Sequence, residues 1–219
     1  VERVTSAYEN FNFHEVFHSL YHFCVVDMSS FYLDVLKDRL YTFRSDSLER
    51  RAAQWVLQQI LLAMTRLMAP ILSFTSEEVW QIMRQSAQNR EHRATLTEES
   101  VFLSPFPETD AVYLNKELEK KWDELFVLRN EMNKALESKR AERLIGNSLE
   151  AKVILYIPES KEPGAESIAQ RYKTLLSECR DFLTTFFIVS AVEVTDTRSD
   201  TSFKSCLLYT SPIPRDRQK

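Results

Sequence analysis

The chain has 219 residues, of which 44% are hydrophobic and 27% charged, and its formal net charge at pH 7 is −4. This composition supports a folded core, and it excludes general disorder and the global positive field that drives non-specific nucleic-acid binding. Gly146 and Gly164 are the only glycines, so the sequence excludes a glycine-rich phosphate loop and places any associated ATP site outside this chain.

The spacing of the cysteines and the hydropathy of the sequence indicate the cellular compartment of the protein. Cys24, Cys179 and Cys206 lie far apart and form no CxxC pair, which suits reduced thiols and argues against a disulfide framework. No run approaches the ~20 apolar residues of a membrane span, and no signal-peptide layout stands at the start. We therefore expect a cytoplasmic protein without a membrane or DNA partner. Because Val1 reads as lying inside a helix, we expect a piece of a longer protein.

The first half of the chain predicts a helical bundle. Capping-box patterns that start helices stand at Asn12-x-x-Glu15, Asp46-x-x-Glu49 and Thr75-x-x-Glu78. The helix after Asn12 directs Phe13, Val16 and Phe17 to the core by their spacing. Polar residues at 27–30 predict a break before a helix over about 30–41, and Pro70 ends the long helix that follows.

The second half predicts one long helix and a small β-α-β unit. The polar stretch 86–100 is the best linker, and 101–107 is expected to be extended. Helical spacing covers about 115–143, alternating residues predict strands at 151–157 and 188–194, and a helix at 166–184 joins them. We therefore predict a mainly α protein with these parts: a helical bundle at 1–100, an extended segment and long helix at 101–146, a β-α-β module at 147–195, and a tail at 196–219.

The stretch "HEVFH" matches the H-E-x-x-H pattern of zinc proteases. His14 and His18 would share a helix face, but His22 continues the same row, and three ligands along one rigid helix cannot surround one ion. The fourth histidine, His92, lies in the predicted linker. We interpret the match as accidental and predict neither a metal site nor a catalytic residue.

A longer pattern is more specific. The segments "FYLDVLKDRLY" from Phe31 and "APILSFTSEEVW" from Ala69 resemble the anticodon-binding helical domain of class I aminoacyl-tRNA synthetases, in the isoleucine, valine and leucine branch. The triplet "KDR", the stretch "FCVVD" and the later "IGNSLEA" are most similar to the isoleucyl members. The resemblance covers roughly residues 1–195. It implies an anticodon-binding bundle followed by a long helix and a small α/β module.

The resemblance also implies the setting of the chain. Its family uses ATP and Mg²⁺ to activate isoleucine and charge isoleucine tRNA, in a catalytic domain that lies upstream together with an editing domain. Those signatures are missing here, so we expect a tRNA-recognition part that is inactive alone and holds no cofactor. The zinc module with two CxxC pairs that often ends bacterial members is also missing. Residues 207–219 resemble translated adapter sequence, and we expect a truncated, non-native tail.

Two local clusters are net positive in a net-negative chain, as contact with tRNA phosphates requires. The candidate tRNA-binding residues are Lys37, Arg39, Arg44, Arg50, Arg51, Lys139, Arg140, Arg143, Asn147 and Ser148. Pairing of these cations with nearby carboxylates is the structural alternative. Tyr32, Trp55, Trp80 and Trp122 have core spacing and are expected to pack. The same region of a valyl or leucyl enzyme, or a helical protein-interaction module without RNA binding, stays open.

Overall fold

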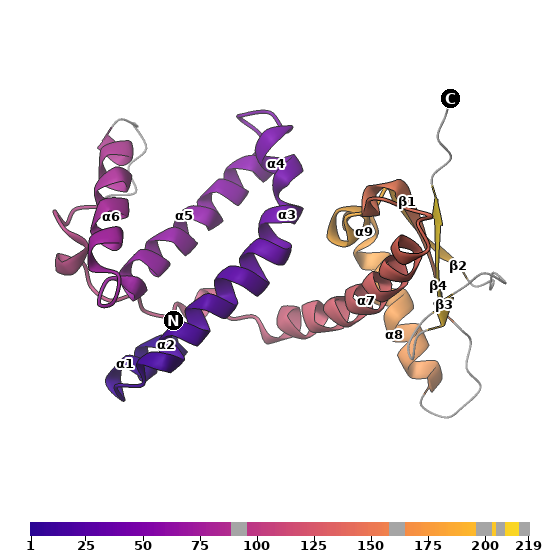
Figure 1. Cartoon of the computed structure of the whole chain (residues 1–219), viewed down its shortest axis with the longest axis horizontal. Helices are drawn as coiled ribbons and strands as arrows, with labels where there is room; N and C mark the ends of the chain where they lie inside the picture. The colour runs from indigo at the N-terminus through magenta and orange to yellow at the C-terminus, as the bar shows by residue number, and fades with distance from the viewer. Residues whose placement is uncertain (89–95, 158–164, 196–202, 205–208, 215–219) are drawn as a thin grey trace. The chain divides into compact units, whose positions relative to one another are not determined.

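The computed structural model describes the chain except residues 89–95, 158–164, 196–202, 205–208 and 215–219. The chain forms two compact units, Val1–Tyr113 and Leu114–Lys219, shown in Figure 1. Among the described residues, no helix combines the length and the apolar character that crossing a bilayer requires.

The first unit is entirely helical in its described part. Its elements are α1 (Glu2–Glu9), α2 (Phe13–His22), the π-helical η1 (Phe23–Tyr32), α3 (Leu33–Val35), α4 (Lys37–Tyr41), α5 (Leu48–Met68), α6 (Ser73–Gln88) and two 3₁₀ turns, η2 (Val101–Leu103) and η3 (Ala111–Tyr113). The predicted bundle is therefore confirmed, but three predicted details are wrong: a helix break, the helix starts and the buried face of α2.

The first correction concerns the predicted break at 27–30. The chain stays helical there through η1, and Figure 1 shows α2, η1 and α3 as one continuous ribbon. The Ser30 hydroxyl donates to the Val26 carbonyl, so a polar side chain that suggested a cap instead bonds within the helix. The wider π turns shift the phase of the apolar pattern, and this phase shift looks like a break in the sequence.

The second correction concerns the helix starts. Asn12 precedes α2, but its side chain makes no capping hydrogen bond. The cap of α5 is Ser47 rather than Asp46, because the Ser47 Oγ accepts from the Arg50 N–H at 3.3 Å. Helix α6 begins at Ser73, two residues before the predicted Thr75 cap.

The third correction concerns the face of α2. Val16 is fully buried with Val4, Ala7 and Leu67, but Phe13 and Phe17 are 52% and 58% exposed. Their rings contact other aromatic side chains at the surface instead of the core. Helical spacing identified an apolar row, but it could not establish which members of the row have a partner.

A second core joins α5 and α6 to residues 96–103, which begin inside the predicted linker 86–100. Trp80 and Val101 are buried together with Ala69, and Leu96 packs against them. The Trp80 indole N–H donates to the Glu98 carbonyl at 3.1 Å. Residues 96–103 thus belong to the first unit, which extends past the predicted boundary at residue 100 to Tyr113.

The second unit contains the long helix and a sheet. Its elements are α7 (Lys116–Ala141), the 3₁₀ turn η4 (Ser148–Glu150), β1 (Ala151–Tyr156), α8 (Ala165–Glu178), α9 (Arg180–Phe187), β2 (Ala191–Thr195), β3 (Phe203–Lys204) and β4 (Tyr209–Pro214). Strand β1 pairs in parallel with β2, with Val153 opposite Val192. This confirms the predicted β-α-β unit, with its helix divided into two at Cys179.

The sheet has the order β2-β1-β4-β3. Strand β4 runs antiparallel to β1, with Val153 opposite Pro212. The backbone of the predicted tail therefore supplies two strands, while 196–202, 205–208 and 215–219 lie outside the described residues. Its non-native origin stays a prediction.

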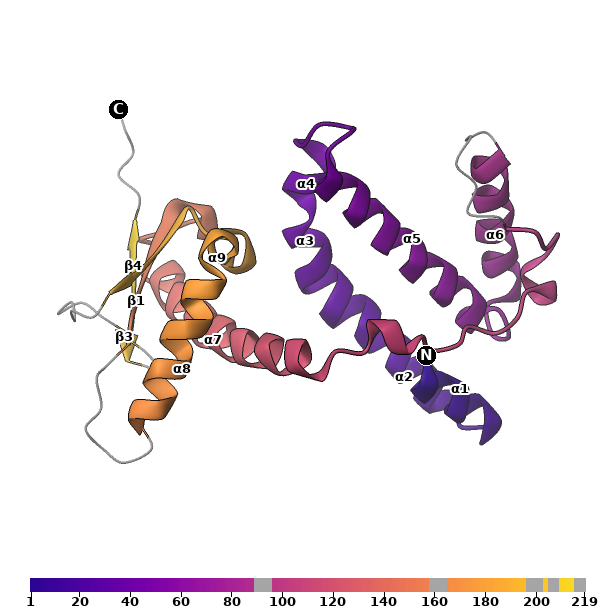
Figure 2. The ribbon, with the colours of Figure 1, turned by 180° about the vertical axis from the view of Figure 1, so that it is seen from behind.

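The core of the second unit lies between the sheet and its helices. Figure 2 shows α7, α8 and α9 on one side of the sheet. Val153 and Leu155 of β1 point inward and are almost completely buried. The buried face of α7 consists of Leu125, Leu128, Met132, Ala135 and Leu136. The Trp122 ring contacts Phe182 and Phe186, which fixes α9 against α7.

Candidate nucleic-acid interface

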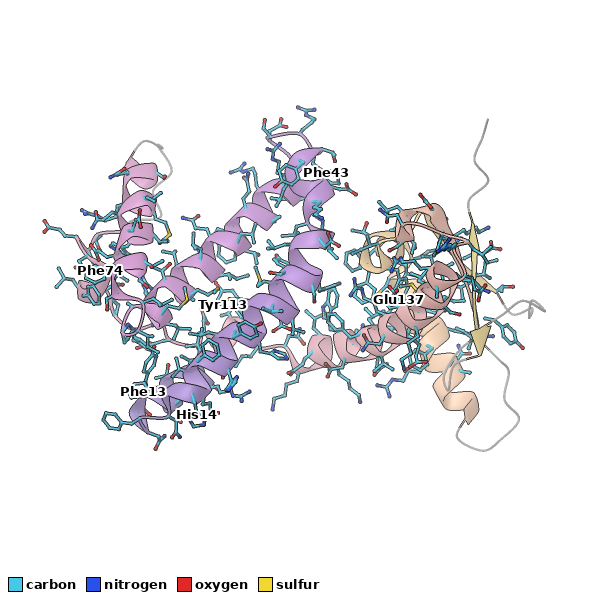
Figure 3. All side chains as sticks on the ribbon, viewed as in Figure 1. Phe13, His14, Phe43, Phe74, Tyr113 and Glu137 are labelled. Carbon is cyan, nitrogen blue, oxygen red and sulfur yellow. The ribbon has the colours of Figure 1, made fainter. Side chains whose placement is uncertain are left out.

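The two histidines of the HEVFH stretch, and His22 after it, lie on the outside of α2. His14, His18 and His22 are all exposed, and Figure 3 shows His14 at the surface of this helix. His22 lies 3.9 Å from the Asp27 carboxylate, which is itself exposed. Within the described residues, no group of three or more His, Cys, Asp or Glu side chains could hold a metal ion. The described residues therefore supply no further ligands with which His14 and His18 could form a metal site.

The first basic cluster forms one end of the helical unit. We call residues 37–51 the basic tip; it comprises α4, the loop after α4 and the first turn of α5. Lys37 forms an ion pair with Asp34. This hydrogen bond and charge raise the pKa of the Lys37 ammonium above its ordinary value, so Lys37 stays charged at neutral pH.

Two arginines of the basic tip organise its loop. Arg44 bonds Asp46 through two parallel contacts, Nε to Oδ1 at 3.1 Å and Nη2 to Oδ2 at 2.8 Å. Arg50 Nη1 donates to the Phe43 carbonyl at 2.9 Å. These contacts support the structural alternative for both residues. The Arg44 side chain is nevertheless 85% exposed, so it remains accessible to a ligand.

The remaining two cations of the tip differ in exposure. Arg39 is half-buried, and its charge opposes the burial that raises the pKa of the Tyr32 phenol. Arg51 is exposed on the first turn of α5. Arg51 and Lys37 are therefore accessible positions for contacts with phosphate, while Arg39 lies closer to the helix packing.

The second basic cluster forms the end of α7 and the turn after it. Lys139 pairs with Glu142 at 2.8 Å, and this hydrogen bond lowers the pKa of the Glu142 carboxyl. Arg140 pairs with Glu137, and its Nη2 donates to the Ser148 hydroxyl at 3.4 Å. The structure thus brings Arg140 and Ser148 together across eight residues of sequence.

The turn after α7 places Arg143 in a special backbone conformation. Its φ is 57°. The Arg143 N–H bonds the Arg140 carbonyl at 3.0 Å, and the Leu144 N–H bonds the Lys139 carbonyl at 3.0 Å. These two bonds form a Schellman cap, in which glycine is the usual residue at the Arg143 position. The Arg143 side chain is exposed and stands just outside the helix.

Asn147 has a local structural role in the same turn. Its side-chain oxygen accepts from the Leu149 N–H at 3.1 Å and caps η4. The Gly146 N–H donates to the Glu150 carboxylate at 2.9 Å. Asn147 and Gly146 therefore fix the path of the chain between α7 and β1, and they position Arg143 and Ser148 at the two ends of this turn.

Other basic residues of α7 have structural partners. Arg129 Nε donates to the Phe186 carbonyl at 3.1 Å and its guanidinium lies 6.0 Å from the Phe186 ring. Lys134 bonds Glu131 at 2.7 Å. Arg129 and Lys134 therefore have local structural roles, whereas Lys116 and Lys120 at the N-terminal end of α7 are exposed.

Charge counting missed two aromatic side chains in the basic tip. Tyr41 is 81% exposed and Phe43 is 40% exposed, and Figure 3 shows Phe43 where the loop joins α4 to α5. Alternation of aromatic and basic residues in "KDRLYTFR" is the signal that could have identified them. Among the predicted packing residues, Trp80 is 1% exposed, but Trp55 is 48% exposed and lies beside Tyr113.

Comparisons with known proteins agree with this geometry. The family model "Anticodon-binding domain of tRNA ligase" matches residues 1–155. An isoleucine–tRNA ligase of Desulforamulus reducens is 44% identical over 194 residues, 89% of this chain and 19% of the relative. One from Syntrophotalea carbinolica is 42% identical over 198 residues, 90% of this chain and 19% of the relative. The chain thus spans about a fifth of the length of the curated relatives it matches. With a family model that covers most of its length, the chain belongs to the anticodon-binding domain family of tRNA ligases.

Proposed function

We propose that this chain recognises the anticodon side of isoleucine tRNA as part of an isoleucine–tRNA ligase. The match of residues 1–155 to the anticodon-binding family carries this proposal, and the identity to isoleucine–tRNA ligases supports the choice of amino acid. The exposed cations of the basic tip and of the α7 end supply the charge that phosphate contacts need.

In this proposal the chemistry belongs to the rest of the polypeptide. An upstream catalytic domain would bind ATP and Mg²⁺, activate isoleucine and transfer it to tRNA, and it would be the chain's protein partner in the cytoplasm. The present chain would hold the tRNA without a cofactor or a zinc module, and it would be inactive alone. Its contribution is binding energy and orientation, which position the far end of the same tRNA for reaction.

The candidate tRNA-binding residues fall into two groups: those that would contact phosphate directly, and those that would hold the local structure or add polar contacts. Lys37, Arg44 and Arg51 in the tip, with Arg143 in the α7 turn, project charge for phosphate oxygens. Four further cations would contribute by holding the loop or the helix end in place: Arg39, Arg50, Lys139 and Arg140. Asn147 and Ser148 would add polar contacts.

Filter binding tests the proposal. We expect the full chain to bind isoleucine tRNA more tightly than valine or leucine tRNA. We expect Arg140→Ala with Arg143→Ala to weaken binding by about tenfold, since the half-buried Arg140 and the exposed Arg143 would each contribute roughly 0.7 kcal/mol. The control is Lys116→Ala with Lys120→Ala, which removes the same charge from the other end of α7.

Two results would count against the proposal. Equal loss of tRNA affinity in both double variants would show that the C-terminal end of α7 contributes only through its general positive charge. Failure of the wild-type chain to bind any tRNA would favour a helical module that contacts only protein.

A further inference from the structure

Tyr41 is exposed to an extent that protein packing does not explain. It is the last residue of α4, and 81% of its surface is accessible. An aromatic ring left in water forgoes roughly the 1.5–3 kcal/mol that burial of a large apolar side chain contributes. The ring is therefore available to a ligand with a flat apolar face.

The backbone that carries Tyr41 is held firmly by its neighbours. The Thr42 hydroxyl donates to the Asp38 carbonyl at 2.7 Å, and the Thr42 N–H donates to the same oxygen at 2.9 Å. On the other side, Arg50 bonds the Phe43 carbonyl at 2.9 Å. The ring of Tyr41 thus projects from a fixed position, which lowers the entropy cost of ordering it against a ligand.

Cations surround this position and identify the ligand class. Lys37 lies one turn earlier on α4, on the same face as Tyr41, and Arg44 follows three residues later. Residues 37–51 contain five basic and three acidic side chains, a surplus of two positive charges. A projecting aromatic ring beside exposed cations is an arrangement that can hold unpaired nucleic-acid bases.

We propose that the Tyr41 ring stacks on an unpaired base of the tRNA anticodon loop while Lys37 and Arg44 bind phosphates beside that base. This assignment rests on the proposed function and adds to it the contact by which the chain would distinguish an unpaired loop from a paired stem. A stacked ring accepts any base face, so Tyr41 contributes affinity for unpaired RNA and leaves the choice among bases to other contacts.

The test compares two RNAs on the full chain. One is a hairpin with the isoleucine anticodon loop and a 2-aminopurine base in that loop, and the other is a fully paired duplex with the sequence of its stem. We expect Tyr41→Ala to weaken binding of the hairpin by about 5- to 150-fold and to leave duplex binding unchanged. Tyr41→Phe keeps the ring and should retain hairpin affinity and the quenching of 2-aminopurine fluorescence.

Phe74→Ala is the matched control, because Phe74 is 93% exposed but lies on α6, away from the tip in Figure 3. Three results would overturn the assignment: unchanged hairpin binding by Tyr41→Ala, equal losses on hairpin and duplex, or equal losses in Tyr41→Ala and Phe74→Ala. If the wild-type chain binds neither RNA, the proposed function itself fails. If it binds the hairpin and Tyr41→Ala binds equally well, only the stacking contact fails.

Discussion

In the part of the chain that the structure describes, three residues hold a backbone conformation that glycine usually adopts. Phe11, Arg143 and Ile188 have φ values of 57°, 57° and 55°, and they follow α1, α7 and α9. At each site two N–H groups bond back to the last turn of the helix, so the cap is complete despite the side chain. A non-glycine residue in this conformation costs roughly 1–2 kcal/mol, which the surrounding hydrogen bonds and packing offset.

Arg143 permits a clean test of this cost. We expect Arg143→Gly to raise the free energy of unfolding of the second unit by about 1 kcal/mol over Arg143→Ala, since alanine keeps the strain and glycine removes it. Urea unfolding followed by circular dichroism measures the difference. Arg143→Gly should also bind tRNA less tightly than wild type, because the same substitution removes a proposed phosphate contact. Equal stabilities of the two variants would contradict the strain.

At the scale of elements, Glu77 joins α6 to the segment that follows it. Its Oε2 accepts from the Ser100 hydroxyl at 2.7 Å and from the Val101 N–H at 3.0 Å, and its Oε1 accepts from Gln81 at 2.7 Å. The hydrogen bond from Gln81, followed by those from Ser100 and Val101, lowers the pKa of the Glu77 carboxyl. The ionised side chain thus stabilises the position of η2 beside Trp80.

This shift predicts a dependence of stability on pH. Because the pKa of Glu77 is lower in the folded chain, its contribution is complete above the ordinary glutamate value of about 4.3 and is lost as pH falls through the folded value. We expect Glu77→Gln to unfold at lower urea than wild type at pH 7, with a difference that shrinks in acid. The exposed neighbour Glu78, changed to Gln, is the control. A difference in stability between Glu77→Gln and wild type that persists unchanged well below about pH 4.3 would exclude this dependence of stability on the ionisation of Glu77.

The elements that the sequence predicted correctly are those whose periodicity matches their burial. The alternation around Val153 and Leu155 gave β1, and the spacing from Leu125 to Leu136 gave α7. The capping boxes failed because an Asn, Asp or Thr pattern recurs by chance: the Asn12 side chain makes no capping bond at α2, and at α5 the bond is made by Ser47 instead of Asp46. Whether a capping side chain turns toward the helix depends on contacts that the local pattern does not contain.

At the scale of the whole molecule, binding must overcome a net charge of −4. Attraction to RNA therefore depends on local clusters, whose effect declines with salt. We expect the logarithm of the tRNA association constant to fall linearly with the logarithm of salt concentration, and Lys37→Ala with Arg51→Ala to make that slope shallower by about 1.4, or ~0.7 for each lost contact.

Filter binding over a range of salt concentrations measures both slopes. The variant Lys116→Ala with Lys120→Ala again has the same net charge and should keep the wild-type slope. A slope that changes equally in both double variants would show that the total charge, rather than the basic tip, governs the attraction.

Only part of the candidate site could be predicted from the sequence. Counting charges located both clusters, since local charge surplus is visible in a linear chain. It could not separate Arg50, which bonds the Phe43 carbonyl, from Arg51, which is exposed. Charge counting also missed Tyr41, which carries no charge and which only the alternation of aromatic and basic residues in 37–44 indicates.

The π-helical turns of η1 also determine where this chain can change in length. A backbone N–H that bonds five residues back instead of four encloses about one more residue in each turn. Deletion of a single residue from 23–32 would let one turn close as an ordinary α-helical turn, while Val16 and Val35 on either side keep their buried faces. The same deletion within α5 would rotate the remainder of that helix by about 100° and turn Leu67 away from the core. We therefore expect the loss of one residue to be tolerated in η1 and to be disruptive in α5.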